Sequence, residues 1–163
     1  HEPWFPCKRN DWVILADGTR GVVASLSHEM VELVQRGGSH KIYQTADFLG
    51  LAPLNISLNF RLKIPFGISY NLQKDSTGKV LEILKSYISE QIEKEGYNKN
   101  LLNLGVEFQQ AGASSLDIVV IADFKGDQAP LYNRLSRAIQ RWCVDACTLN
   151  NWEIPFPQLT IHK

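Results

Sequence analysis

The stretch S-L-D-I-V-V-I-A-D-F, residues Ser115–Phe124, decides the fold. Its apolar centre is rich in β-branched residues and lies between two aspartates, a composition that favours a strand over a helix. Alternation places only apolar side chains on one face, at positions 116, 118, 120, 122 and 124. The opposite face carries Asp117, Val119, Ile121 and Asp123, so it is too apolar for open solvent and too acidic for a core. We therefore predict a central strand with helices on one face and, on the other, a subunit contact through Val119 and Ile121.

Composition indicates a globular, soluble chain. The sequence has 163 residues, is 44% hydrophobic and carries 17 basic and 17 acidic residues, so no sequence-wide field attracts nucleic acid or anionic lipid. Its apolar runs reach only about five residues, whereas a membrane-spanning helix needs about 20. The sequence begins at His1 rather than at a methionine, and we expect this start to lie inside a longer protein. Three cysteines, Cys7, Cys143 and Cys147, favour a reducing compartment.

Residues 1–60 have the pattern of a small β domain, SH3-like or Sm-like. Asp17-Gly18 and Arg36–Ser39 are hairpin signals, and residues 45–53 are expected to be irregular. The expected strands are Trp12–Ala16, Gly21–Ser27, Met30–Gln35, His40–Tyr43 and Asn55–Phe60.

Residues 61–163 predict a second domain with the ferredoxin-like order βαββαβ, which makes the whole chain α+β. Alternation predicts strands at 61–70, 104–110 and 115–124, and a short last strand at Gln158–Ile161. Apolar residues at helical spacing predict helices over 77–95, closed by Gly96, and from Asp127 and Pro130 to about Leu149. In this topology the first and third strands are central, and both helices cover the same face.

No residue set in the sequence indicates catalysis or a bound metal, and we expect no cofactor. Cys143 and Cys147 lie four residues apart on one predicted helix, but no further ligands complete a zinc site, so helix packing is the simpler interpretation. His28, His40 and His162 share no motif spacing. Asp117 and Asp123 are about 20 Å apart along a strand, too far for a carboxylate pair. We interpret the two acids as the solvated ends of that strand.

The end of the chain carries the sharpest motif. N-N-W-E-I-P-F-P-Q-L-T-I-H, residues Asn150–His162, resembles the closing segment of the soluble part of the small-conductance mechanosensitive channel (MscS) family. Similar matches follow in the right order along nearly the whole chain, at Glu2–Leu15, Asp17–Val23, Phe66–Tyr70 and Ala111–Ile118. The chain departs from the family pattern at Asn10-Asp11, where the family has Gly-Asp, and we expect a left-handed turn at Asn10. It also departs at Gln44-Thr45, where the family commonly has Pro-Asn.

The resemblance implies the cytoplasmic vestibule part of a channel that passes ions and small solutes on membrane tension. It implies a homoheptamer, attached to the inner membrane through an N-terminal region that precedes this sequence, with this part on the cytoplasmic side. Neither an enzymatic activity, a small-molecule substrate nor a nucleic-acid partner is expected.

Two alternatives use the same fold. One is a free-standing binding module for a peptide or RNA, although RNA-recognition domains of this topology stack bases on aromatic residues, and Asp117, Val119, Ile121 and Asp123 include none. The other is a small enzyme, which would need a pocket with a perturbed titrating group.

Overall fold

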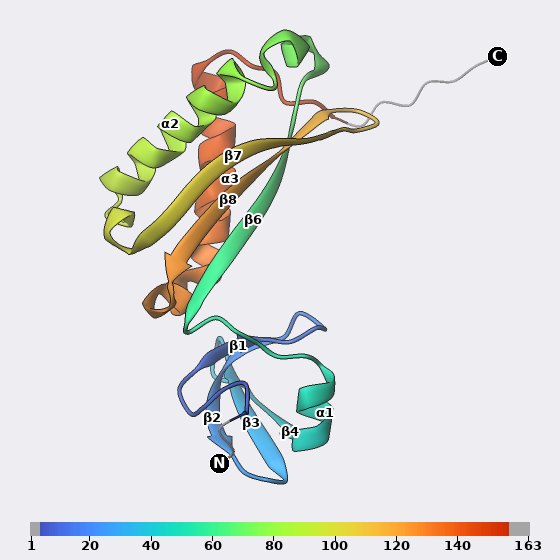
Figure 1. Ribbon diagram of the computed structural model, residues 1–163, viewed down its shortest axis with the longest axis vertical. Coiled ribbons are helices and arrows are strands. Elements are labelled where there is room, and N and C mark those ends of the chain that lie inside the picture. Colours follow the sequence, from blue (N-terminus) through green and yellow to red (C-terminus); the bar gives the residue numbers. More distant parts are fainter. Residues whose placement is uncertain (1–3, 157–163) are drawn as a thin grey trace, which may run out of the picture. The chain divides into compact units, whose positions relative to one another are not determined.

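The computed structural model describes residues 4–156 and divides into two compact units (Figure 1). The first unit comprises the described residues up to Phe60 together with Lys125–Pro130. The second comprises Arg61–Phe124 and the described residues from Leu131 onward. The predicted fold class, α+β with antiparallel sheets, is confirmed.

The first unit is a five-stranded antiparallel sheet with the order β4-β3-β2-β1-β5. Both predicted hairpins form, because glycine adopts the positive φ that each turn requires: Gly18 has φ 88°, and Gly37 and Gly38 each have φ 93°. Asn10 also has a positive φ, 75°, which confirms the left-handed turn expected there. The strands are β1 (Trp12–Ile14), β2 (Arg20–Leu26), β3 (Met30–Gln35), β4 (His40–Gln44) and β5 (Leu54–Asn55).

The core of the first unit is made by alternate strand residues and by one short helix. Val13, Val23, Val31 and Leu33 are buried, and Phe48 from helix α1 (Thr45–Gly50) closes the core. The prediction that residues 45–53 are irregular is therefore wrong. Six residues are too few to show a helical period, and tertiary burial of Phe48 rather than local propensity stabilises this helix.

The predicted strand Asn55–Phe60 is also wrong as a single element. The structure has β5 ending at Asn55 and β6 (Asn59–Ile68) beginning four residues later. Between them the Ser57 amide donates to the Asn55 side chain, and the Ser57 hydroxyl accepts from the Trp12 amide at 2.8 Å. These side-chain hydrogen bonds replace the ladder that a continuous strand would have made.

Gly126 allows an unusually close backbone approach within the first unit. It begins the 3₁₀ turn η3 (Gly126–Leu131), and a Cβ built on it would lie 1.8 Å from the carbonyl oxygen of Ser57. No side chain fits at that distance, so any other residue forces the backbone of η3 or of Ser57 to move.

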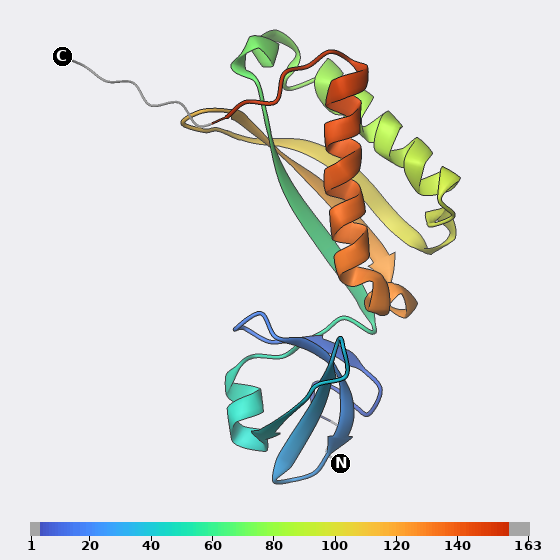
Figure 2. The same cartoon turned by 180° about the vertical axis from the view of Figure 1, so that it is seen from behind.

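In the second unit, β6 is followed by helix α2 (Lys79–Lys94), strands β7 (Leu101–Ala111) and β8 (Leu116–Lys125), and helix α3 (Tyr132–Leu149). The sheet order is β6-β8-β7, so the strand predicted to be central lies in the middle. Leu116, Ile118, Val120, Ala122 and Phe124 are all buried, as the alternation predicted. Figures 1 and 2 show α2 and α3 on the same face of this sheet.

The helix ends follow their local signals. Gly96, with φ 84°, ends α2, and Asn151, with φ 58°, follows the end of α3. The helix starts lie later than predicted, because 3₁₀ turns η1 (Tyr70–Asp75) and η3 precede α2 and α3. A third such turn, η2 (Asn98–Asn100), leads into β7. The predicted last strand, Gln158–Ile161, lies outside the described residues.

We expect Gly126→Ala to lower the free energy of unfolding by about 1–3 kcal/mol, the usual cost of forcing extra atoms into a packed site. Urea denaturation followed by circular dichroism measures it. Gly50→Ala is the matched control, since a Cβ at Gly50 meets nothing within 4 Å. Equal stability of the two variants would contradict the close approach at Gly126.

Candidate functional site

The candidate site is the face of the second unit's sheet that α2 and α3 leave uncovered. Val119 and Ile121 occupy its centre on β8 and are only partly buried, whereas their neighbours in sequence are fully buried. Across the β7–β8 ladder, Val119 is opposite Glu107 and Ile121 is opposite Gly105. Gly105 has no side chain, and a Cβ built there would meet nothing within 4 Å, so the position directly opposite Ile121 is open. The centre of this face therefore combines two partly buried apolar side chains, Val119 and Ile121, with the exposed Glu107.

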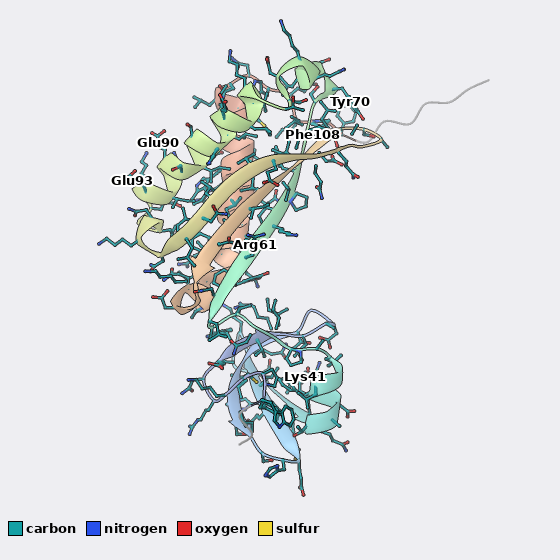
Figure 3. The ribbon with its side chains drawn as sticks, in the orientation of Figure 1. Lys41, Arg61, Tyr70, Glu90, Glu93 and Phe108 are labelled. Atoms are coloured by element: carbon teal, nitrogen blue, oxygen red, sulfur yellow. The ribbon has the colours of Figure 1, made fainter. Side chains whose placement is uncertain are left out.

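An ion pair lies at one end of this open face. The Arg61 guanidinium on β6 donates two hydrogen bonds to Asp123 on β8, Nε to Oδ1 at 2.8 Å and Nη2 to Oδ2 at 3.0 Å. Figure 3 shows Arg61 on β6, beside β8. The hydrogen bond from Arg61 and its charge lower the pKa of Asp123 below its usual range. The two-pronged geometry links the side chains of β6 and β8 at this end of the face.

Asp117 lies at the other end of the open face and accepts two side-chain hydrogen bonds. The Ser115 hydroxyl donates to Oδ1 at 2.6 Å, and the Gln110 amide donates to Oδ2 at 3.2 Å. Two glycines make room for this cluster: a Cβ at Gly67 would lie 2.9 Å from the Ser115 hydroxyl, and one at Gly112 would lie 2.7 Å from Asp117 Oδ2. The two acids thus have separate partners at opposite ends of β8, rather than being simply solvated as the sequence suggested.

Sequence reasoning placed Val119 and Ile121 on this face but did not predict which residues lie at its two ends. Arg61, Gly67 and Gln110 are distant in sequence, and only strand register brings them to this face. A usable signal was present for Gly67 and Gly112, since both lie in the short motifs Phe66–Tyr70 and Ala111–Ile118.

The cysteines have the environment of core residues. Cys143 and Cys147 are buried in α3 and Cys7 is buried in the first unit; all three are free thiols. Burial raises the pKa of Cys7 to about 11 and that of Cys143 to about 12, so both are uncharged thiols at neutral pH. Among residues 4–156, no three histidine, cysteine or acidic side chains gather as metal ligands would.

Of the histidines, His28 and His40 lie among residues 4–156. His40 pairs through Nδ1 with Glu32 on the neighbouring strand β3, while His162 lies outside the described residues.

Neither α2, α3 nor any other helix between residues 4 and 156 combines the length and hydropathy of a membrane span.

We expect Asp123→Asn to reduce the acid sensitivity of the fold. Because the folded-state pKa of Asp123 is lowered, its pairing stabilises the fold above the unfolded-state pKa of about 3.9, and this stabilisation is lost as the pH falls through the folded-state value. Urea midpoints measured between pH 7 and pH 3 should therefore fall less steeply for this variant than for the parent.

Asp145→Asn is the control for that experiment, because it removes a carboxylate from the exposed side of α3. The urea midpoints of the two variants should therefore depend on pH differently. If the urea midpoint of Asp123→Asn falls with pH as steeply as that of the parent, the Arg61 pair does not stabilise the fold.

The fold is similar to that of solved structures over almost its full length. The crystal structure of Helicobacter pylori MscS in its closed state matches 99% of this chain with a TM-score of 0.67 and 20% sequence identity. Two cryo-EM structures of Arabidopsis thaliana MSL1 each match 93% of the chain, with TM-scores of 0.56 and 0.52 and identities of 14% and 13%.

This chain spans only part of those proteins, 60% of the H. pylori chain and 52% and 54% of the two MSL1 chains. No protein-family model matches the sequence, and no curated protein matches it. At these identities the comparisons establish a shared fold.

Proposed function

We propose that this chain is the cytoplasmic vestibule part of a mechanosensitive channel of the MscS family, and that the whole protein passes ions and small solutes when membrane tension rises. One observation carries the proposal: the match to H. pylori MscS extends over 99% of this chain and so includes both units. The sequence motifs that resemble the family also lie in both units. A chance likeness of either domain alone would not account for this.

The proposed role needs no covalent chemistry from this part of the protein. Selection of solutes in a pore depends on the size and charge of its openings. The buried cysteines are neutral thiols, and the acids of the open face are held by Arg61, Ser115 and Gln110. We therefore assign transport and not catalysis to the whole protein.

We further propose that the protein is a homo-oligomer, a heptamer by family resemblance, located in the inner membrane with this part on the cytoplasmic side. The open face around Val119 and Ile121 is the surface that we assign to subunit contact. Covering Val119 and Ile121 removes apolar surface from water, which favours association. The acids at both ends of the face already have partners within one copy.

The channel function is tested on the full-length protein, expressed in a bacterial host that lacks its own mechanosensitive channels. Suction applied to excised membrane patches should open a current that is absent from patches without the protein. Survival of the host after a sudden fall in external osmolarity should rise in parallel. A well-expressed, membrane-inserted protein that gives no tension-dependent current would overturn the proposal.

The subunit contact is tested with Val119→Ser and Ile121→Ser combined in the full-length protein. Burying a valine or isoleucine side chain stabilises by about 1.5–3 kcal/mol, so the double change should shift detergent-solubilised protein toward smaller species in light scattering. Val144→Ser is the control, because Val144 is 40% exposed on α3, which covers the opposite face of the sheet. An unchanged oligomer in the double variant, with the same fold by circular dichroism, would exclude this face as the contact.

A further inference from the structure

A pocket lined by arginines lies outside the open face, between the C-terminal end of α2 and the first half of α3. Its volume is about 380 Å³. The residues that line it are Glu95, Tyr97, Arg134, Arg137, Ala138 and Arg141. The three arginines follow one stripe of α3, at spacings of three and four residues, so their side chains leave the helix on the same side.

Only one of these arginines is neutralised within the pocket. Arg141 donates to both carboxylate oxygens of Glu95, at 3.1 and 3.5 Å. Glu95 is the single acid among the lining residues, so the pocket retains a net of two positive charges, those of Arg134 and Arg137. Like charges at this spacing on one helix repel and do not stabilise it.

The helix ends do not explain the two arginines. Arg134 lies in the first turn of α3, where the positive end of the helix dipole disfavours a cation, and that turn contains no acid and no side-chain cap. Three of the last four carbonyls of α2 also have partners, because those of Gln91, Ile92 and Glu93 accept backbone amides from the residues that follow the helix. Neither helix therefore needs a guanidinium at this place.

We propose that this pocket binds an anion through a phosphate group. Such a group carries a charge of about −1.5 to −2 at pH 7, which matches the two uncompensated guanidiniums better than a single carboxylate does. Arginine also presents paired N–H donors that fit phosphate oxygens. Tyr97 also lines the pocket. The site does not depend on the channel function proposed above.

The test is isothermal titration calorimetry of the protein with inorganic pyrophosphate at fixed ionic strength. We expect saturable binding that weakens by about tenfold or more in the double variant Arg134→Gln, Arg137→Gln, since a hydrogen bond to a charged group is typically worth that much. The control is Lys79→Gln combined with Lys85→Gln, which removes the same charge from exposed positions of α2 and should leave affinity unchanged. All four positions are exposed, and circular dichroism checks that each variant is folded.

Two further measurements define the ligand. Sodium glutamate at the same ionic strength should not compete with pyrophosphate, because it offers only carboxylates. Sedimentation with phosphatidylcholine vesicles, with and without phosphatidic acid, tests for a lipid headgroup. If the protein binds phosphatidic acid vesicles through the arginines but does not bind pyrophosphate, the pocket binds a lipid phosphate.

Three results would overturn the proposal. They are the absence of binding to pyrophosphate and to phosphatidic acid vesicles, equal losses in the arginine and lysine variants, and full competition by glutamate.

Discussion

Everything in the second unit depends on the burial of one face of β8 beneath two helices. Five alternate side chains from Leu116 to Phe124 are buried on the face of the sheet that α2 and α3 cover, and all five are apolar. Their burial stabilises the middle of the sheet, and β6 and β7 complete it by hydrogen bonding on either side. Because the side-chain period of a strand is two, the same constraint sends Val119 and Ile121 to the other face.

The sequence predicted those features that a periodic pattern encodes directly. The alternation in Ser115–Phe124 indicated the central strand, and the glycines at 18, 37 and 38 indicated the hairpins. It missed helix α1, whose six residues are too short for a period and depend on the burial of Phe48. It also joined β5 to β6, because the hydrogen bonds of Asn55 and Ser57 that separate them leave no trace in an apolar pattern.

The residues that make up the open face could be predicted only in part, because a sequence pattern encodes the faces of one strand but not the pairing between strands. Val119 and Ile121 lie on one strand, so alternation alone places them on one face. Arg61 reaches Asp123 across 62 positions of sequence, and this pairing depends on register, which one sequence does not specify. The arginine pocket was missed as well, since its wall combines α3 with the end of α2.

The two acids at the ends of the open face do not oppose the subunit contact that we propose for its centre. A carboxylate buried without a partner costs far more than a valine gains, so acids beside an interface would oppose association. Here Asp123 accepts from Arg61, while Asp117 accepts from Ser115 and Gln110, all within one copy of the chain. A partner that covers Val119 and Ile121 therefore does not have to supply charges for these two acids.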